Sequence, residues 1–492
     1  MRVAASIIFS ASSFISLVIM TRYVGESYGM MMWGMALVAT FNSALDIGFH
    51  SANIKKISEG KDLNKCVSTY LAIRIVISAA TICLVLLSSF ILGRAHDGFP
   101  PEFWSVTFVF IAYFVLSNLL MVMNGTFTGH MNAGKESAVL STEYIVRSVI
   151  LIALAISGAS AVVLSLGYIV GVICALVVAF ILFRSLKVRL VRPSFFKEYA
   201  SFVAPLALPL ILIAVVGYVD KVMIGASYGE LEVGIFTAAY GVVYSLMTIG
   251  IVMNGLLLSH MTKLLKEGRS EEARNTLWSA QKYMAILLMP ATAFLLIFGN
   301  ETAIVLFQVQ FAPSGPVLSI LAIGVYFTVL NGMLTQLLYS MDRRAIYGRS
   351  AIIYAVVTLI LFATFIPGPF HGVGGGAEGA AISLVISGLL FSVLLSVAAK
   401  RIGTFGIYPR LYIHVAAAVA VMFILYMINE HLSPSGLPWM VVLAMLSVGV
   451  YSAILAAARE LTPGDIAFIR ETINIKNLYD DLRSEMKNDG QR

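Results

Sequence analysis

Seven charged residues lie within or at the edges of long apolar stretches: Arg22, Asp46, Arg74, Glu143, Arg147, Asp220 and Lys221. A charge near the centre of a bilayer costs about 2.5–3.5 kcal/mol on insertion scales, so each residue needs a partner or a function. Arginine presents a planar fork of N–H donors that matches phosphate oxygens, and lysine presents a point charge. Four basic residues against three acidic ones are compatible with a cavity that binds a phosphate or pyrophosphate group.

Two pairs among these residues have a purely structural alternative. Glu143 and Arg147 are four residues apart on one expected helix, so they can simply pair with each other. Asp46 and Arg74 lie on adjacent expected spans and can form a structural pair. Arg74 lies deeper in its span than Arg22 does, so a role in a cavity and a role in packing both stay open.

The remaining charges lie near span ends. Arg22 and Lys221 can extend their charged ends to the membrane interface. Asp220 either takes part in ion coupling or neutralises the neighbouring Lys221. His50, near the end of the second span, is a polar interface residue more often than a proton carrier. The three acidic residues Asp46, Glu143 and Asp220 are candidates for coupling to an ion or for pairing with the basic residues.

The composition excludes a water-soluble globular protein. Of the 492 residues, 59% are hydrophobic and 12% are charged, and the mean hydropathy is +0.90. Charged residues make up roughly a quarter of soluble domains. The net charge of +7 is expected to reflect membrane topology, and no nucleic-acid partner is predicted. The three cysteines, Cys66, Cys83 and Cys174, form neither a disulfide framework nor a zinc pattern.

About 20 apolar residues are needed to cross the hydrocarbon core. This length predicts an all-α polytopic membrane protein with about fourteen spans, at 3–20, 29–53, 68–93, 104–124, 139–158, 161–183, 199–219, 234–258, 282–308, 314–341, 347–366, 378–399, 411–429 and 437–458. The break between the fifth and sixth spans is short, at 157–160. The segment 260–281 is expected either to lie along the interface as an amphipathic helix or to be solvated.

The connections between spans support this number. Twenty-one basic residues lie in alternate connections: Lys55, Lys56, Lys61, Lys65, Lys135, Arg184, Lys187, Arg189, Arg192, Lys197, Lys263, Lys266, Arg269, Arg274, Lys282, Arg343, Arg344, Arg349, Lys400, Arg401 and Arg410. The intervening connections contain Arg22, Arg94 and Lys221. The positive-inside rule therefore predicts a multi-pass protein of the cytoplasmic membrane, with both termini in the cytoplasm.

Part of the chain is repeated about two hundred residues later. Val24-Gly25-Glu26-Ser27-Tyr28-Gly29 is similar to Ile224-Gly225-Ala226-Ser227-Tyr228-Gly229, and each segment follows the first span of a group of six. Six is an even number, so the two groups would be parallel repeats with a substrate path between them. The expected organisation is a first lobe at 1–190, a second lobe at 191–404, two additional spans at 405–459, and a cytoplasmic tail at 460–492 whose helix begins with Thr462 as its cap.

The chain resembles the oligosaccharide and polysaccharide flippases, a family of the multidrug/oligosaccharidyl-lipid/polysaccharide exporter superfamily. The resemblance rests on the segments 21–29 (TRYVGESYG), 45–49 (LDIGF), 218–225 (YVDKVMIG) and 233–240 (VGIFTAAY), with Gly379-Ala380-Ala381. It implies a V-shaped bundle of two lobes that moves prenyl-(pyro)phosphate-linked glycans across the membrane by alternating access. Related peptidoglycan-precursor flippases use an arginine after the first span toward the lipid pyrophosphate, and Arg22 occupies that place. Their paired arginines around the second span have no match, because Asp46 and His50 stand there.

The functional prediction is therefore a flippase for a lipid-linked oligosaccharide or polysaccharide precursor, with Arg22, Arg74, Arg147 and Lys221 toward the substrate. The alternative is an ion-coupled multidrug or cation antiporter of the same fold. No enzyme is predicted, because the chain has neither a phosphate-binding Gly-Lys-Ser/Thr loop nor a catalytic triad. No cofactor or metal is predicted; Na⁺ and H⁺ are both open as coupling ions. The expected partners are the lipid-linked glycan and membrane lipids, with a glycan polymerase or glycosyltransferases as further candidates.

Overall fold

A computed structural model describes residues 2–95, 99–368, 375–403, 405–432, 436–462 and 465. This part of the chain is built from helices and contains no strand. The helices are α1 (Arg2–Tyr23), α2 (Gly25–Asp46), α3 (Phe49–Ser58), α4 (Leu63–Ala95), α5 (Pro101–Gly129), α6 (Ala133–Ile156), α7 (Ala161–Phe183), α8 (Phe196–Val203), α9 (Ala207–Tyr228), α10 (Glu230–Lys266), α11 (Ser270–Phe307), α12 (Ser314–Ser340), α13 (Arg344–Phe365), α14 (Gly376–Ile402), α15 (Leu411–Leu432) and α16 (Leu437–Ala457).

The helices confirm an all-α, multi-pass membrane protein. Within the described residues, twelve are long and apolar enough to cross a membrane, with α8 and α9 counted together. The pair α2 and α3, bent by 43°, adds a thirteenth span. The 22-residue helix α1 then gives the predicted number of about fourteen. The short break predicted between the fifth and sixth spans is present, with Gly158 in the left-handed region at φ +73°.

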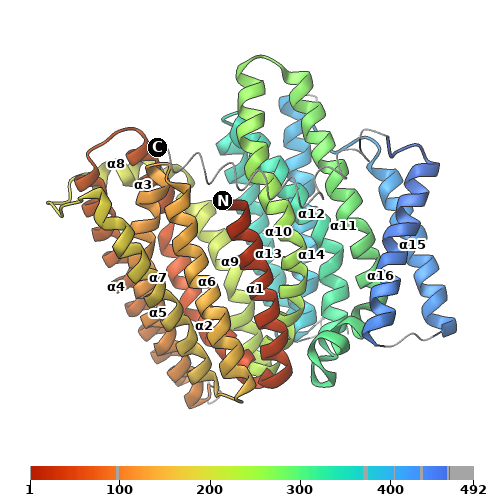
Figure 1. Cartoon of the computed structure of the whole chain (residues 1–492), viewed down its shortest axis with the longest axis horizontal. Coiled ribbons are helices and arrows are strands. Elements are labelled where there is room, and N and C mark those ends of the chain that lie inside the picture. The colour runs from red at the N-terminus through yellow and green to blue at the C-terminus, as the bar shows by residue number, and fades with distance from the viewer. Residues whose placement is uncertain are drawn as a thin grey trace.

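Successive connections lie at alternate faces of the bundle. We call the face with the α3–α4, α7–α8, α10–α11 and α12–α13 connections the basic face, and the other the opposite face. In Figure 1 the basic face is at the top, where α1 begins and the α10–α11 hairpin projects. The segment predicted at 260–281 is not a separate interfacial helix, because α10 and α11 continue into it and turn at 267–269; its tip is exposed, which agrees with the solvated alternative.

Two helical groups pack against each other (Figure 1). The first lobe contains α1 and α2 with α4 to α7, and the second contains α9 to α14. Helix α2 packs on α9 and α10, and α1 packs on α10. Helices α15 and α16 lie on the outer side of α11, at the far end of the second lobe from the first.

The second span is broken in its last third. Ile47 and Gly48 adopt left-handed backbone conformations, at φ 32° and φ 91°, and separate α2 from α3. Glycine adopts this conformation without steric cost, so Gly48 makes the break tolerable. The break places Asp46 at the end of α2, where its side chain leaves the regular helix face.

The connection between the lobes is attached to the first lobe. The backbone N–H groups of Arg189 and Val191 donate to the side chains of Asn64 and Ser68, at 2.8 and 2.9 Å. The hydroxyl of Tyr199 on α8 donates to Asn53 Oδ1 at 2.8 Å, and both residues are fully buried. Residues 191–203, which the expected boundaries assign to the second lobe, therefore pack on the first, together with Arg189.

The described start of the tail agrees with the sequence. Thr462 and Asp465 cap each other: Thr462 N–H and Oγ1 donate to Asp465 Oδ2 at 2.8 and 2.7 Å. Lys282 of α11 also donates to Asp465, at 2.6 Å. Burial raises the pKa of the Asp465 carboxyl, but the hydrogen bonds from Lys282 and Thr462 outweigh burial and lower that pKa to about 2. The expected helix beyond 465 lies outside the described residues.

Candidate functional site: a cavity between the lobes

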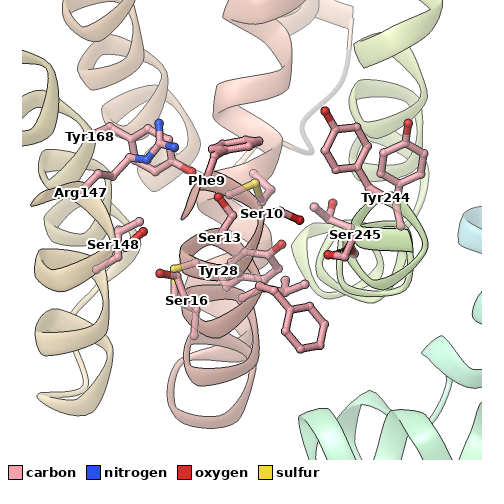
Figure 2. A pocket seen from close by; sticks show the side chains of 18 residues that line it. Phe9, Ser10, Ser13, Ser16, Tyr28, Arg147, Ser148, Tyr168, Tyr244 and Ser245 are labelled. Atoms are coloured by element: carbon pink, nitrogen blue, oxygen red, sulfur yellow. Dashed lines mark hydrogen bonds between the residues drawn. The ribbon is translucent and has the colours of Figure 1, made fainter. Parts of the chain in front are cut away.

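A cavity of about 270 Å³ lies between the two lobes and is lined from α1, α2, α6, α7 and α10. Figure 2 shows serines of α1 in the middle, with Arg147 and Tyr168 on one side and Tyr244 and Ser245 on the other. Its hydroxyl groups come from both lobes: Ser10, Ser13, Ser16, Ser148, Thr237 and Ser245. Its aromatic walls come from Phe9, Tyr28, Tyr168, Tyr240 and Tyr244.

Arg147 is the one charged residue among the described residues that line this cavity. Its guanidinium lies between the rings of Tyr168 and Tyr144, with its carbon 4.9 and 5.3 Å from the ring centroids. Gly171 lets α7 approach closely, because a Cβ there would be 2.9 Å from Arg147 Cβ. Stacking between two rings fixes the plane of the guanidinium and leaves its N–H edge for a ligand.

The predicted pairing of Arg147 with Glu143 is confirmed, but the contact is loose. Arg147 Nη1 is 3.5 Å from Glu143 Oε1, which also accepts from the Tyr113 hydroxyl at 3.2 Å. Both charged side chains are almost buried, with 12% and 8% of their surface exposed. A guanidinium carries five N–H donors. One long contact to Glu143 therefore leaves donors that can reach phosphate oxygens.

Lys221 lies just behind the cavity wall. Its Nζ is 5.2 and 5.3 Å from the ring centroids of Phe236 and Tyr240 on α10. It also lies 3.0 Å from Oδ1 and 3.1 Å from Oδ2 of the buried Asp220. The rings of Phe236, Tyr240 and Tyr244 stack along α10 at centroid distances of 6.0 and 6.2 Å. Asp220 thus neutralises Lys221, as one of the two alternatives predicted.

Arg74 lies away from the cavity, inside the first lobe. It is 1% exposed, and its Nη2 lies 2.9 Å from Asp46 Oδ1. Its Nε donates to the Tyr70 hydroxyl at 2.8 Å, and its Nη1 donates to Asn118 Oδ1 at 3.1 Å. The Tyr70 hydroxyl also contacts His50 Nδ1, at 3.1 Å. The predicted structural pair of Asp46 and Arg74 is therefore present, as part of a network beside the α2–α3 break.

Arg22 also lies outside the cavity lining, at the opposite face. Its Nε donates to the carbonyl of Leu306 at 2.7 Å, and its Nη2 donates to the carbonyl of Val305. These carbonyls belong to the last turn of α11, which ends at Phe307. A cation at a helix C-terminus satisfies free carbonyls and the negative end of the helix dipole. Arg22 therefore joins the first lobe to the second in this conformation.

The repeated glycine segments meet at the same place and close the opposite face. A Cβ on Gly29 would lie 2.0 Å from the carbonyl oxygen of Glu230, and a Cβ on Gly225 would lie 2.3 Å from the Trp33 ring. Only glycine permits such close approach of two helices. We call Gly25, Gly29, Gly225, Gly234 and the Arg22 contact the inter-lobe seal. The two segments of the sequence repeat thus form a contact surface between the lobes.

Each of the three acidic candidates has a basic partner: Asp46 pairs with Arg74, Glu143 with Arg147, and Asp220 with Lys221. No group of three or more potential metal ligands is present among the residues described. The hydroxyl and aromatic lining of the cavity was missed at the level of sequence. The one indication of this lining in the sequence is the spacing of Ser10, Ser13 and Ser16, which places these serines near one face of α1.

The sequence profile of the polysaccharide biosynthesis protein family matches residues 3–257. The chain belongs to the polysaccharide biosynthesis protein family. This family member is 21% identical over 401 residues to a probable low-salt glycan biosynthesis flippase, Agl15, of Haloferax volcanii, with 80% of this chain and 81% of that protein covered. The resemblance drawn from residues 21–29 and 218–240 is thereby confirmed.

Solved structures share the fold of this polysaccharide biosynthesis family member. The lipid II flippase MurJ in an inward closed conformation matches with a TM-score of 0.73 at 14% identity, covering 93% of this chain and 98% of MurJ. An inward-facing multidrug resistance transporter of the MATE family and MOP superfamily matches with a TM-score of 0.62 at 16% identity, covering 80% and 94%. A MOP superfamily transporter from Pyrococcus furiosus gives a TM-score of 0.56 at 16% identity, covering 81% and 95%.

Proposed function

We propose that this protein is a flippase that moves a lipid-linked oligosaccharide or polysaccharide precursor across the cytoplasmic membrane by alternating access. One observation carries the proposal: Arg147 stands alone as a charge in a cavity of hydroxyl and aromatic groups that both lobes line. A phosphate would bind the guanidinium edge, and sugar hydroxyls would bind the serine and tyrosine hydroxyls. The family and its flippase relatives support a transporter, not an enzyme.

The size of the cavity fits part of such a substrate. Ligand pockets commonly have volumes of 300–1,000 Å³, so about 270 Å³ admits a phosphate with part of the glycan. A separate, almost wholly apolar cavity of about 300 Å³ lies between α1, α10, α11 and α16, lined by residues such as Phe14, Leu246, Phe294 and Val448. An apolar surface of this kind suits a prenyl chain, which stays toward the lipid while the head group enters the inter-lobe cavity.

The distribution of charge supports an orientation. The positive-inside rule assigns the basic face to the cytoplasm, with both termini there. The inter-lobe seal then closes the outer side, so this conformation receives its substrate from the cytoplasmic side. Opening of the seal would release the guanidinium of Arg22 from the α11 carbonyls, and Arg22 would then be available to the phosphate on its way out. Glycosyltransferases that build the glycan and a polymerase that uses it are the partners expected on the two sides.

The alternative of a cation antiporter has less support. A cationic substrate calls for an acidic group that is free to pair with it. Glu143 and Asp220 are the acidic residues nearest the cavity, and each is paired with a basic side chain. The single charge on the cavity wall is positive, which repels a cation.

Transport by the purified protein in proteoliposomes tests the proposal. The probe is a fluorescent polyprenyl diphosphate that carries a neutral disaccharide, and the readout is its initial rate of translocation. We expect wild type to translocate the probe and Arg147→Gln to lower the rate at least tenfold, because one charge-assisted contact is worth about 1.5–3 kcal/mol. Arg184→Gln is the matched control, since Arg184 is an exposed arginine on the basic face, against the ring of Phe180.

Three outcomes would contradict the proposal. Wild type that does not translocate the probe rules out this substrate class. An equal loss in Arg147→Gln and Arg184→Gln shows that the cavity arginine has no special role. Uptake of a cationic dye by the same liposomes, without translocation of the glycolipid, favours the antiporter.

A further inference from the structure

A second cavity, of about 310 Å³, lies inside the second lobe between α10, α12, α13 and α14. Tyr240 on α10 lines both this cavity and the inter-lobe cavity. A molecule in one cavity is therefore one side chain away from a molecule in the other. We call the second cavity the C-lobe chamber.

The lining of the C-lobe chamber is uncharged and combines apolar side chains with several hydroxyl groups and one amide. None of its described lining residues is Asp, Glu, Lys, Arg or His. Hydroxyl groups come from Thr328, Thr335 and Tyr347, and an amide comes from Asn331. The Asn331 side chain is held in place, because its Oδ1 accepts from Ser392 Oγ at 2.7 Å and its Nδ2 donates to the Gly388 carbonyl at 3.1 Å.

One wall of the chamber is aromatic. The rings of Tyr354 and Phe391 are stacked, with centroids 4.9 Å apart and planes at 27°. Tyr347 adds a third ring, at 6.4 Å from Phe391. Stacked rings of this kind offer a broad apolar face, with hydroxyl groups at its edge.

Gly388 keeps the chamber open. It lies within α14, where glycine is about 1 kcal/mol less favourable than alanine. A Cβ at this position would meet no atom within 4 Å, and its φ is not in the left-handed region. Neither helix packing nor backbone conformation therefore requires glycine here. The consequence of the missing side chain is free space on the chamber wall.

We propose that the C-lobe chamber binds an uncharged sugar residue of the transported glycan, while the lipid phosphate is held at Arg147; this inference rests on the proposed function. A sugar ring has an apolar C–H face that fits the Tyr354–Phe391 surface, and hydroxyls that match Thr328, Thr335 and Asn331. A cationic ligand would find no counter-charge in the chamber. A hydrocarbon chain would make no use of the remaining acceptor sites on Thr328 and Asn331 or of the hydroxyl of Thr335, whereas sugar hydroxyls can hydrogen-bond to them.

The test compares two lipid probes in proteoliposomes of the full-length protein. Both are polyprenyl diphosphates, one with a single hexose and one with a neutral tetrasaccharide. We expect Gly388→Leu, which fills the chamber, to lower translocation of the tetrasaccharide probe at least tenfold and that of the hexose probe less than twofold. Gly449→Leu is the matched control: Gly449 is an exposed glycine of α16 whose Cβ would also meet no atom within 4 Å. An equal effect on both probes, or none on either, would overturn the proposal.

A binding measurement tests the proposed sugar site in the chamber independently of transport. Detergent-purified protein is titrated with free neutral tetrasaccharides of glucose, mannose and galactose. We expect wild type, Arg147→Gln and Gly449→Leu to bind at least one of them with similar affinity, and Gly388→Leu to bind it at least tenfold more weakly. Thr335→Val removes one hydroxyl at nearly constant volume and should weaken binding severalfold.

The outcomes separate the two proposals. If no tetrasaccharide binds, or if Gly388→Leu and Thr335→Val both bind normally, the chamber is not a sugar site. If wild type binds a tetrasaccharide in the chamber but translocates neither lipid probe, the sugar site stands and the flippase proposal fails.

Discussion

The two lobes share a helical plan but place their charges differently. The first lobe buries ion pairs within its membrane helices, Asp46 with Arg74 and Glu143 with Arg147. The second lobe has one such pair, Asp220 with Lys221 on α9, beside the inter-lobe cavity. Its interior chamber has no charged residue among the described lining residues, and the buried charges Lys282, Glu460 and Asp465 lie near the basic face or in the segment after α16. The first lobe thus supplies the arginine that lines the inter-lobe cavity, whereas the described polar groups that line the chamber of the second lobe are all neutral.

The substitution with the largest expected effect tests whether the Asp46–Arg74 ion pair of the first lobe stabilises the fold. Asp46→Leu should lower the free energy of unfolding by about 3–5 kcal/mol, because it leaves the buried Arg74 without its counter-charge. Asp46→Leu combined with Arg74→Met should recover most of that loss, since a paired replacement is often neutral. The measurement is unfolding of the purified protein in mixed micelles, analysed as a double-mutant cycle.

The same experiment has a counterpart in the second lobe. Asn331→Leu removes a neutral amide that is hydrogen-bonded to Ser392 and Gly388, and should cost about 1–2 kcal/mol. A loss for Asn331→Leu as large as for Asp46→Leu would contradict the distinction between the charged network of the first lobe and the neutral chamber of the second.

The next largest effect is expected at the inter-lobe seal, which joins the two lobes. Gly29→Leu should open it, because even a Cβ would lie 2.0 Å from the backbone oxygen of Glu230. We expect a cysteine introduced at Thr237 to react at least tenfold faster with an impermeant thiol reagent added from the opposite face. Gly217→Leu is the control, since a Cβ there meets no atom within 4 Å. Unchanged labelling in Gly29→Leu would show that the lobes part elsewhere.

The smallest effect concerns the charges at the rim of the second lobe. The pKa of Asp465 is lowered to about 2, against about 3.9 in an unfolded chain. The stabilisation from its contact with Lys282 should therefore be complete above pH 4 and disappear as the pH falls from about 4 to 2. Unfolding of wild type should be pH-dependent in that window, and the difference from Asp465→Asn should vanish at its lower end.

Hydropathy and loop charges were sufficient to predict the spans, including the four-residue break at 157–160. Both signals are local, and the bilayer imposes them directly on the sequence. The pairing of Glu143 with Arg147 was predictable for the same reason, because helical spacing alone brings them together. The proximity of Asp46 and Arg74 was anticipated from adjacent spans, although Tyr70 and Asn118 were not identified as members of their network.

The position of Arg22 was less predictable. Its acceptors are backbone carbonyls at the end of α11, and a carbonyl has no signature in the sequence. The inter-lobe cavity was invisible for a related reason. Serine, threonine and tyrosine occur on many faces of membrane helices, and only packing shows that those of α1, α6 and α10 converge.

The attachment of residues 189–203 to the first lobe restricts how the lobes can move. Hydrogen bonds to Asn53, Asn64 and Ser68 fix these residues, so their connection to α9 of the second lobe is the short 3₁₀ helix Ala204–Leu206. Such a short tether acts as a pivot at one corner of the bundle. The second lobe can rotate about that corner but cannot separate from the first lobe. Its motion is therefore a rotation about a point on the basic face.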